Sequence, residues 1–230
     1  MSSYYSFEPA CDTVETGPVY PQIQKLKPGY NTNKQNSIYS YLAESESING
    51  FPGWEPDLDS FVMHARAKPT DLVSNTIIGG TGLFVSHKLK TILEKHQLPP
   101  HRFFNAKVTY RGNVLNNYYW LHIICDLTDY IDYPASSFFI YKHFRLNSGT
   151  IEIDSKNDYI EKRRRVKEEN PGINITIWSN KIHFKSQSNL YQLFEIGMFD
   201  SQLYITQDLR DDLVDQSITG CKIEKTDKII

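Results

Sequence analysis

The sequence predicts an α+β fold with a mixed, largely antiparallel sheet and three to five helices. Short apolar and aromatic stretches of strand length alternate with segments of helical periodicity. A strand–helix pattern occurs twice, at Leu83–Leu93 and again at Leu203–Leu213. The 230 residues, 40% hydrophobic and 23% charged, are enough to bury a core. Together these observations favour an ordinary globular α+β protein.

The repeated pattern predicts two strand–helix units of similar design. Ser86 and Thr206 stand where a helix N-cap belongs, and we expect each side-chain oxygen to accept a backbone N–H of the first turn. Apolar residues recur at helical spacing after each cap. They are Leu89, Ile92, Leu93 and the adjoining His96 in the first copy, and Leu209 and Leu213 in the second.

We divide the chain into an N-terminal arm and extension, residues 1–69, and one globular α+β unit, residues 70–230. Pro, Tyr and Asn dominate the first 36 residues, which indicates an extended arm with one short strand at 19–26. The pattern then predicts a helix at 37–46, a strand at 61–65 and a short helix at 69–73 capped by Thr70.

The middle of the chain predicts the centre of the sheet. The helix of the first unit is expected to end near Gln97, because Pro99-Pro100 cannot continue it. A strand at 103–110 turns at 111–113 and leads to the strongest strand, 118–124. The continuous apolar character of that strand predicts a central position, covered on both faces.

The last third of the chain predicts strands around a charged helix at 158–169, which carries Glu–Arg and Arg–Glu pairs at helical spacing. Ser179-Asn180 is interpreted as a hairpin turn, and Gly220 as the left-handed residue after the second unit. The strands are expected at 138–141, 150–153, 173–178, 181–184 and 191–196.

Composition narrows the functional class. A net charge of −2 argues against a dedicated nucleic-acid binder. The start Met1–Pro9 has neither a basic nor an apolar signal region, and no run is long enough to cross a bilayer. Cys11, Cys125 and Cys221 are odd in number and far apart, so we expect no disulfide framework and a cytoplasmic location.

The residues that could bind phosphate, ligate a metal or act as a nucleophile do not form a recognisable site in the sequence. The Gly79–Gly82 turn precedes a strand and lacks a following Gly-Lys-Ser/Thr, so a plain turn is favoured over a phosphate loop. His96 and His101 have no third metal ligand nearby in sequence. Cys125 would point away from His122 on a strand, which favours a small packing residue over a nucleophile. We therefore expect no catalytic residue, cofactor or metal.

Two charged segments stand out. The basic run at 162–167 is flanked by carboxylates, which favours a solvated helix face over a nucleic-acid site. The second unit carries four aspartates at spacings of three and four, opposite its leucines. Such stripes are commonly solvent faces; the alternative is a docking surface for a basic partner, and we adopt that as the site hypothesis. The candidate residues are Asp208, Asp211, Asp212 and Asp215.

Four blocks occur in a familiar order and spacing: Gly82–Lys90, Tyr118–His122, Asp129–Phe138, and Leu203–Thr206 through Ile218–Cys221. With these blocks, residues 70–225 resemble immunity protein family eleven of bacterial polymorphic-toxin systems, formerly a domain of unknown function. The final pattern of strand, hydroxyl residue, Leu-rich helix and Thr-Gly is the most specific part of the resemblance.

The resemblance implies a non-enzymatic cytoplasmic protein that binds a cognate toxin and protects the producing cell. It carries over no catalytic residue. Two alternatives stay open from the residues alone. One is an enzyme of unrecognised type acting on nucleotides through the Gly79–Gly82 turn. The other is a nucleic-acid-binding regulator that uses residues 162–167.

Overall fold

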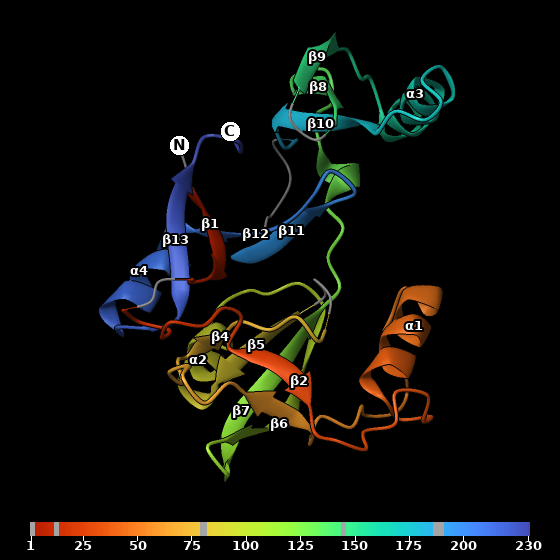
Figure 1. Ribbon diagram of the computed structural model, residues 1–230. Coiled ribbons are helices and arrows are strands. Elements are labelled where there is room, and N and C mark those ends of the chain that lie inside the picture. Colours follow the sequence, from red (N-terminus) through yellow and green to blue (C-terminus); the bar gives the residue numbers. More distant parts are fainter. Residues whose placement is uncertain (1–2, 12–13, 79–81, 144–145, 186–190) are drawn as a thin grey trace.

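The computed structural model describes residues 3–11, 14–78, 82–143, 146–185 and 191–230 (Figure 1). Its helices are α1 (Ile38–Ile48), α2 (His87–Leu93), α3 (Lys156–Glu168) and α4 (Gln207–Asp215), with a 3₁₀ turn η1 at Thr128–Tyr130. The strands are β1 (Tyr4–Pro9), β2 (Ile23–Leu26), β3 (Phe61–Met63), β4 (Leu72–Val73), β5 (Gly82–Ser86), β6 (His101–Tyr110), β7 (Asn113–Ile123), β8 (Ser137–Lys142), β9 (Leu146–Ile151), β10 (Ile175–Lys181), β11 (Leu193–Gly197), β12 (Asp200–Thr206) and β13 (Cys221–Thr226). These elements form three sheets, and the predicted α+β class is confirmed.

The largest sheet has six strands in the order β2-β3-β6-β7-β5-β4. It is mixed, because β3 pairs with β6 in parallel while the other neighbours are antiparallel. Trp120 and Leu121 alternate along β7, and both are fully buried, in different apolar clusters. The predicted central strand, covered on both faces, is therefore confirmed.

A four-stranded sheet, β11-β12-β1-β13, joins the two ends of the chain. β1 lies between β12 and β13 and pairs antiparallel with both. The strand expected at 19–26 is present only over its second half, as β2, and the sequence did not indicate β1. The first 69 residues thus contribute strands to two of the sheets.

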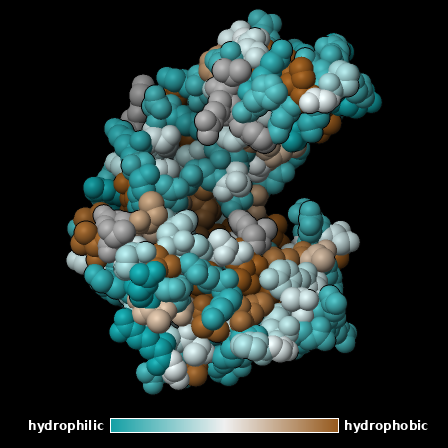
Figure 2. Space-filling view, viewed as in Figure 1, coloured by the Kyte–Doolittle hydropathy of each residue, from teal (hydrophilic) through white to brown (hydrophobic). Residues whose placement is uncertain are grey.

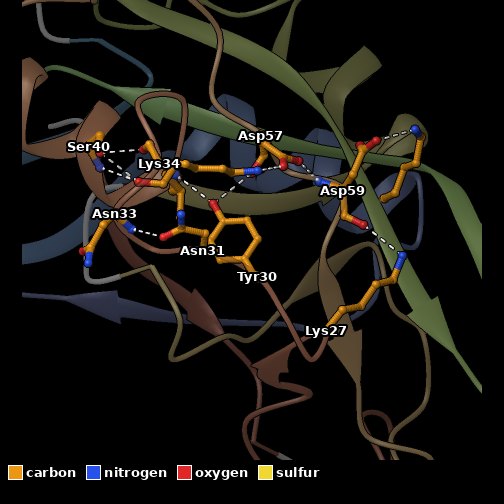
Figure 3. Close-up of polar contacts among 11 residues, drawn as sticks. Lys27, Tyr30, Asn31, Asn33, Lys34, Ser40, Asp57 and Asp59 are labelled. Carbon is orange, nitrogen blue, oxygen red and sulfur yellow. Dashed lines mark hydrogen bonds and ion pairs between the residues drawn. The ribbon is translucent and has the colours of Figure 1, made fainter.

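The N-terminal segment before α1 is held to the β3 region by polar contacts (Figure 3). Lys34 forms an ion pair with Asp57. Tyr30 donates to the Asp57 carbonyl at 3.3 Å and accepts the N–H of Ile38, the first residue of α1, at 3.0 Å. Lys27 Nζ donates to the Asp59 carbonyl at 3.1 Å. These contacts fix the entry of the chain into α1.

The smallest sheet, β10-β8-β9, packs one face against α3. The hairpin predicted at Ser179-Asn180 is wrong, because β10 continues through both residues with an irregularity between Ser179 and Lys181. The predicted helix at 69–73 is also wrong. Leu72 and Val73 form β4, whose residues pair with Val85 and Phe84 of β5.

Figure 1 shows the six-stranded sheet with α1 and α2 in the lower half and the small sheet with α3 at the upper right. The four-stranded sheet lies to the left between them. In the space-filling view the right side of the molecule is hollowed between the α3 and α1 regions (Figure 2). The chain passes between the two regions through the link that follows β7.

The two strand–helix units pack against each other. α2 contacts α4, and the leucines that the sequence placed on their inner sides share one buried cluster. α2 ends at Leu93, with Glu94 as its C-cap, earlier than the expected end near Gln97. The apolar side of each helix therefore packs against the other helix and against neighbouring strands, and the opposite side faces outward.

The predicted caps are confirmed for one unit only. Ser86 Oγ accepts the N–H of Leu89 at 3.1 Å and donates to Asp71 Oδ1 at 2.6 Å. Thr206 occupies the N-cap position of α4 with extended backbone, but its side chain makes no capping bond and its buried Oγ1 has no partner in the described structure. The expectation for the Thr206 side chain is therefore wrong.

Replacing Ser86 with alanine is expected to lower the free energy of unfolding by about 2 kcal/mol, the upper end of the range for lost caps. The loss is large because the hydroxyl also holds Asp71. Thr206→Ala removes a hydroxyl at the equivalent position that makes no capping bond, so a change below about 0.5 kcal/mol is expected. Urea unfolding of both variants measures the difference. Equal losses would contradict the assigned roles.

Candidate functional site

The four aspartates of the site hypothesis lie on one side of α4. Leu209 and Leu213, on the other side, are fully buried. Asp208, Asp212 and Asp215 are exposed and Asp211 is half-buried. We call this surface, Asp208 with Asp211, Asp212 and Asp215, the acidic face of α4. The helical period of 3.6 residues accounts for the grouping.

Two of these carboxylates have partners within the protein. Asp211 Oδ1 accepts from Gln207 Nε2 at 2.7 Å and from Arg210 Nη1 at 2.6 Å. The hydrogen bond from Arg210, and then that from Gln207, lowers the pKa of Asp211. Asp212 lies 2.9 Å from His96 Nε2, and the other ring nitrogen of His96 lies 3.1 Å from Gln192. His96 thus connects the end of the first unit to the acidic face.

Asp208 and Asp215 make no hydrogen bond or ion pair in the described part of the chain. They stand seven positions apart, so about 10 Å of helix separates them. Asp208 lies in the first turn, where the helix dipole favours a negative charge. Val214, which precedes Asp215 in the last turn of α4, is an apolar side chain that is 51% exposed. The outermost part of the acidic face is therefore available to a partner.

A hydrogen-bonded junction positions α4 relative to the first unit. Asp71 Oδ2 accepts both the N–H of Thr219 at 3.0 Å and the Thr219 hydroxyl at 2.9 Å, while its Oδ1 accepts the Ser86 hydroxyl. Gly220 follows, with φ at +81°, and packs directly onto β4. The left-handed conformation expected at Gly220 is confirmed. The sequence carried no signal for the role of Asp71.

His122 and Cys125, which the sequence analysis considered as a possible thiol site, pack against neighbouring residues in the structure. His122 is buried and stacks on Trp120 at 4.8 Å, and burial, with a smaller effect of Arg102, lowers its pKa to about 4. Cys125 donates to the Glu195 carbonyl at 3.4 Å, and burial raises the pKa of its thiol to about 11. Near neutral pH the imidazole is therefore held neutral and the sulfur as a thiol.

The remaining candidates are dispersed. His101 Nδ1 contacts the Pro99 carbonyl at 2.8 Å and is not brought to His96 as a ligand pair. Among the residues that the structure describes, no group of three or more His, Cys, Asp or Glu side chains is placed to hold a metal ion. The Gly79–Gly82 turn falls outside the described residues up to position 81, and Gly82 begins β5.

The basic run at 162–167 forms part of α3 and is partly neutralised within the helix. Lys162 pairs with Asp158 at 2.8 Å, and Arg164 lies 3.9 Å from Glu168. The Arg164–Glu168 pair is one that the sequence predicts, and the Asp158–Lys162 pair has the same four-residue spacing. Exposed pairs of this kind add little stability, and they reduce the positive potential available to a phosphate chain.

A comparison with known families shows which family this protein, with its acidic face on α4, belongs to. The model of the immunity protein family (Imm11) matches residues 3–226. This chain belongs to the Imm11 family. The match confirms the resemblance found in the sequence, and it also takes in the N-terminal segment that the resemblance did not cover. No curated protein sequence matches this Imm11 chain.

In this Imm11 protein, none of the helices within the described ranges combines the length and apolar character of a membrane span. The acidic face of α4, the paired aspartates and the Asp71 junction all lie inside the matched region. The acidic face is therefore a charged surface on a helix whose following turn is held in place by the hydrogen bonds of Asp71 to Ser86 and Thr219.

Proposed function

We propose that this chain neutralises a cognate secreted bacterial toxin by binding it directly in the cytoplasm of the producing cell. Membership of the Imm11 family, over residues 3–226, carries the proposal. His122 and Cys125 fit it, because both serve packing in the forms least suited to acid–base or nucleophilic chemistry. The proposal therefore assigns a binding role without catalysis.

We place the toxin interface at or beside the acidic face of α4. Enzymes that act on nucleic acids or nucleotides expose basic clefts that attract phosphates. An inhibitor that presents carboxylates to such a cleft gains encounter rate and specificity. Asp208 and Asp215 supply unpaired charge, and the packing of Leu209 and Leu213 keeps the helix in place beneath them.

The proposed function is tested by genomic neighbourhood and by protection. A large secreted protein is expected to be encoded directly upstream of this chain, and its C-terminal domain, expressed alone, is expected to stop bacterial growth. Co-expression of this chain should restore growth, and the two purified proteins should form a complex. Toxicity that persists with soluble chain present would overturn the proposal.

Reversing two charges of the acidic face is expected to slow association with that C-terminal domain. Asp208→Lys with Asp215→Lys is the cleaner double change, because Asp211 and Asp212 are already paired with Arg210 and His96. The association rate at low salt should fall by about tenfold, and its dependence on salt should weaken. Stopped-flow binding at two ionic strengths measures both.

The matched control carries the same change in charge on another helix. Glu168→Lys with Glu169→Lys alters exposed positions at the end of α3. Long-range steering alone would slow both double variants alike. An association rate that is unaltered in the α4 variant would assign its aspartates to solvent.

A further inference from the structure

Residues 38–56, which comprise α1 and the loop that follows it, have hydrogen bonds of their own. Ser45 Oγ of the helix donates to the Gly50 carbonyl of the loop at 2.6 Å. Trp54 Nε1 of the loop donates to Glu44 Oε2 of the helix at 2.9 Å. These bonds join helix and loop into one unit, which we call the lid.

Both ends of the lid are fastened at one point. The Asp57 N–H donates to the Asn36 carbonyl at 2.8 Å, just outside the two ends of the lid. Lys34 forms an ion pair with the Asp57 side chain, and Tyr30 donates to the Asp57 carbonyl (Figure 3). The lid can turn about this base without breaking any of these bonds, so the base is suited to act as a hinge.

α1 buries few side chains on the six-stranded sheet that it covers. Three of its eleven residues are buried, Ile38, Tyr41 and Ser45, and one of them is a serine. The Tyr41 ring meets the ring of His122 on β7 edge to face, with centroids 5.5 Å apart. His122 is 3% exposed, and its Nδ1 has no hydrogen-bond partner in the described part of the chain. A buried polar atom without a partner weakens the closed arrangement, because water can reach that atom once the lid lifts.

Arg102 of β6 makes the polar link between the lid and the sheet. Its Nη1 donates to the Pro52 carbonyl at 2.9 Å, and its guanidinium lies 5.0 Å from the ring centroid of Phe51. Within the described ranges, no other residue of the six-stranded sheet forms a hydrogen bond or an ion pair with residues 41–56. Few buried side chains and few hydrogen bonds to the core characterise segments that open before the rest of a fold.

We propose that the lid opens from the six-stranded sheet as one unit while the rest of the fold stays closed, and that Arg102 is the clasp that holds it shut. Opening uncovers the ring of His122. The α1 region borders the hollow on the right side of the molecule (Figure 2), so opening also changes the width of that hollow. This motion is separate from the proposed binding of a toxin and is tested without one.

Amide hydrogen exchange of the purified chain, resolved by NMR, measures the opening. The amides of residues 42–50 are expected to share one opening constant, about 100-fold or more above that of the β7 amides at 119–123. Low concentrations of urea should change the constant of the lid little, because a local opening exposes little surface. Equal protection of α1 and β7, or separate constants that increase toward the ends of the helix, would overturn the proposal.

Removal of the clasp tests the role of Arg102. Arg102→Ala is expected to raise the opening constant of the lid by about 30-fold, because the bond to Pro52 exists only in the closed lid. The matched control is Arg111→Ala. Arg111 Nε donates to the Ala65 carbonyl at 2.8 Å, and its guanidinium lies 5.0 Å from the ring centroid of Tyr110. That contact lies outside the lid and survives opening, so the control should lower global stability and leave the opening constant of the lid unchanged.

A second variant covers the case in which Arg102→Ala melts too early to be measured. Phe51→Ala removes the ring that contacts both Arg102 and His122, and it should also raise the opening constant of the lid. An unchanged constant in the variant that is measured would overturn the proposal. An equal rise in Arg111→Ala would overturn it as well, because the effect would then be a general loss of stability.

Discussion

Replacing Leu121 with aspartate is expected to prevent soluble expression of this chain. Leu121 is fully buried near the end of β7, the central strand of the six-stranded sheet. It packs in the cluster that also holds the leucines of α2 and α4. An unpaired carboxylate there would cost on the order of 5 kcal/mol or more, which is comparable to the whole stability of a small domain.

The matched control lies on the same strand. Val114, near the start of β7, is 47% exposed, so Val114→Asp introduces the same carboxylate where water can reach it. Its free energy of unfolding should change by less than about 1 kcal/mol. The soluble fraction after expression and the urea midpoint give both answers. A soluble, cooperatively unfolding Leu121→Asp chain would show that this strand is not central.

Gly220→Ala is expected to produce the second-largest loss, on the order of 4 kcal/mol. A Cβ at this position would stand 2.1 Å from the Leu72 carbonyl oxygen and 2.4 Å from Thr70 Oγ1. The backbone is also left-handed, where alanine is strained. The clash would separate Thr219 from Asp71 and so loosen the support of α4.

Gly172→Ala separates the clash from the backbone strain. Gly172 has a similar φ, +77°, but no atom lies within 4 Å of the position that its Cβ would take. That variant should lose only about 1–2 kcal/mol, the cost of a left-handed alanine. Chemical denaturation of the two variants measures the difference. Equal losses would mean that the Gly220 contact with β4 adds nothing to stability.

The loss at Gly220 also has a functional consequence. α4 is followed by Thr219-Gly220, which the junction at Asp71 anchors to the first strand–helix unit. If the toxin binds at the acidic face, loosening of this anchor weakens binding although no aspartate is changed. We therefore expect Gly220→Ala to lower both the stability of the fold and the affinity for the toxin, because both depend on the same contact.

Sequence patterns correctly predicted those elements that are determined by residues close to one another in the sequence. β7 was evident from its continuous apolar run, and α3 from its charged pairs at helical spacing. The grouping of the four aspartates on one side of α4 follows from helical geometry alone. The cap at Ser86 was predictable for the same reason, because its acceptor and donor are three residues apart.

The errors arose where the deciding partner lies far along the chain. β1 has no strong strand pattern and is a strand because β12 and β13 pair with it on both sides. The polar pair Ser179-Asn180 resembles a turn, but pairing with β8 keeps it extended. Thr206 is a different case, since it has the right type and place for a cap and its hydroxyl makes neither a capping bond nor another hydrogen bond in the described structure. Propensity is a weak preference that tertiary contacts override.

The sequence by itself therefore determined the α+β class, the two strand–helix units, the central strand and the acidic face of α4. Tertiary structure alone decided that Asp212 meets His96, that Asp71 joins Ser86 to Thr219, and that the rings of Phe139, Tyr141 and Trp178 contact one another on the small sheet. The physical reason is the range of the forces concerned. Periodicity and capping act within a few residues, whereas ion pairs, junctions and faces of a sheet depend on which distant segments pack together.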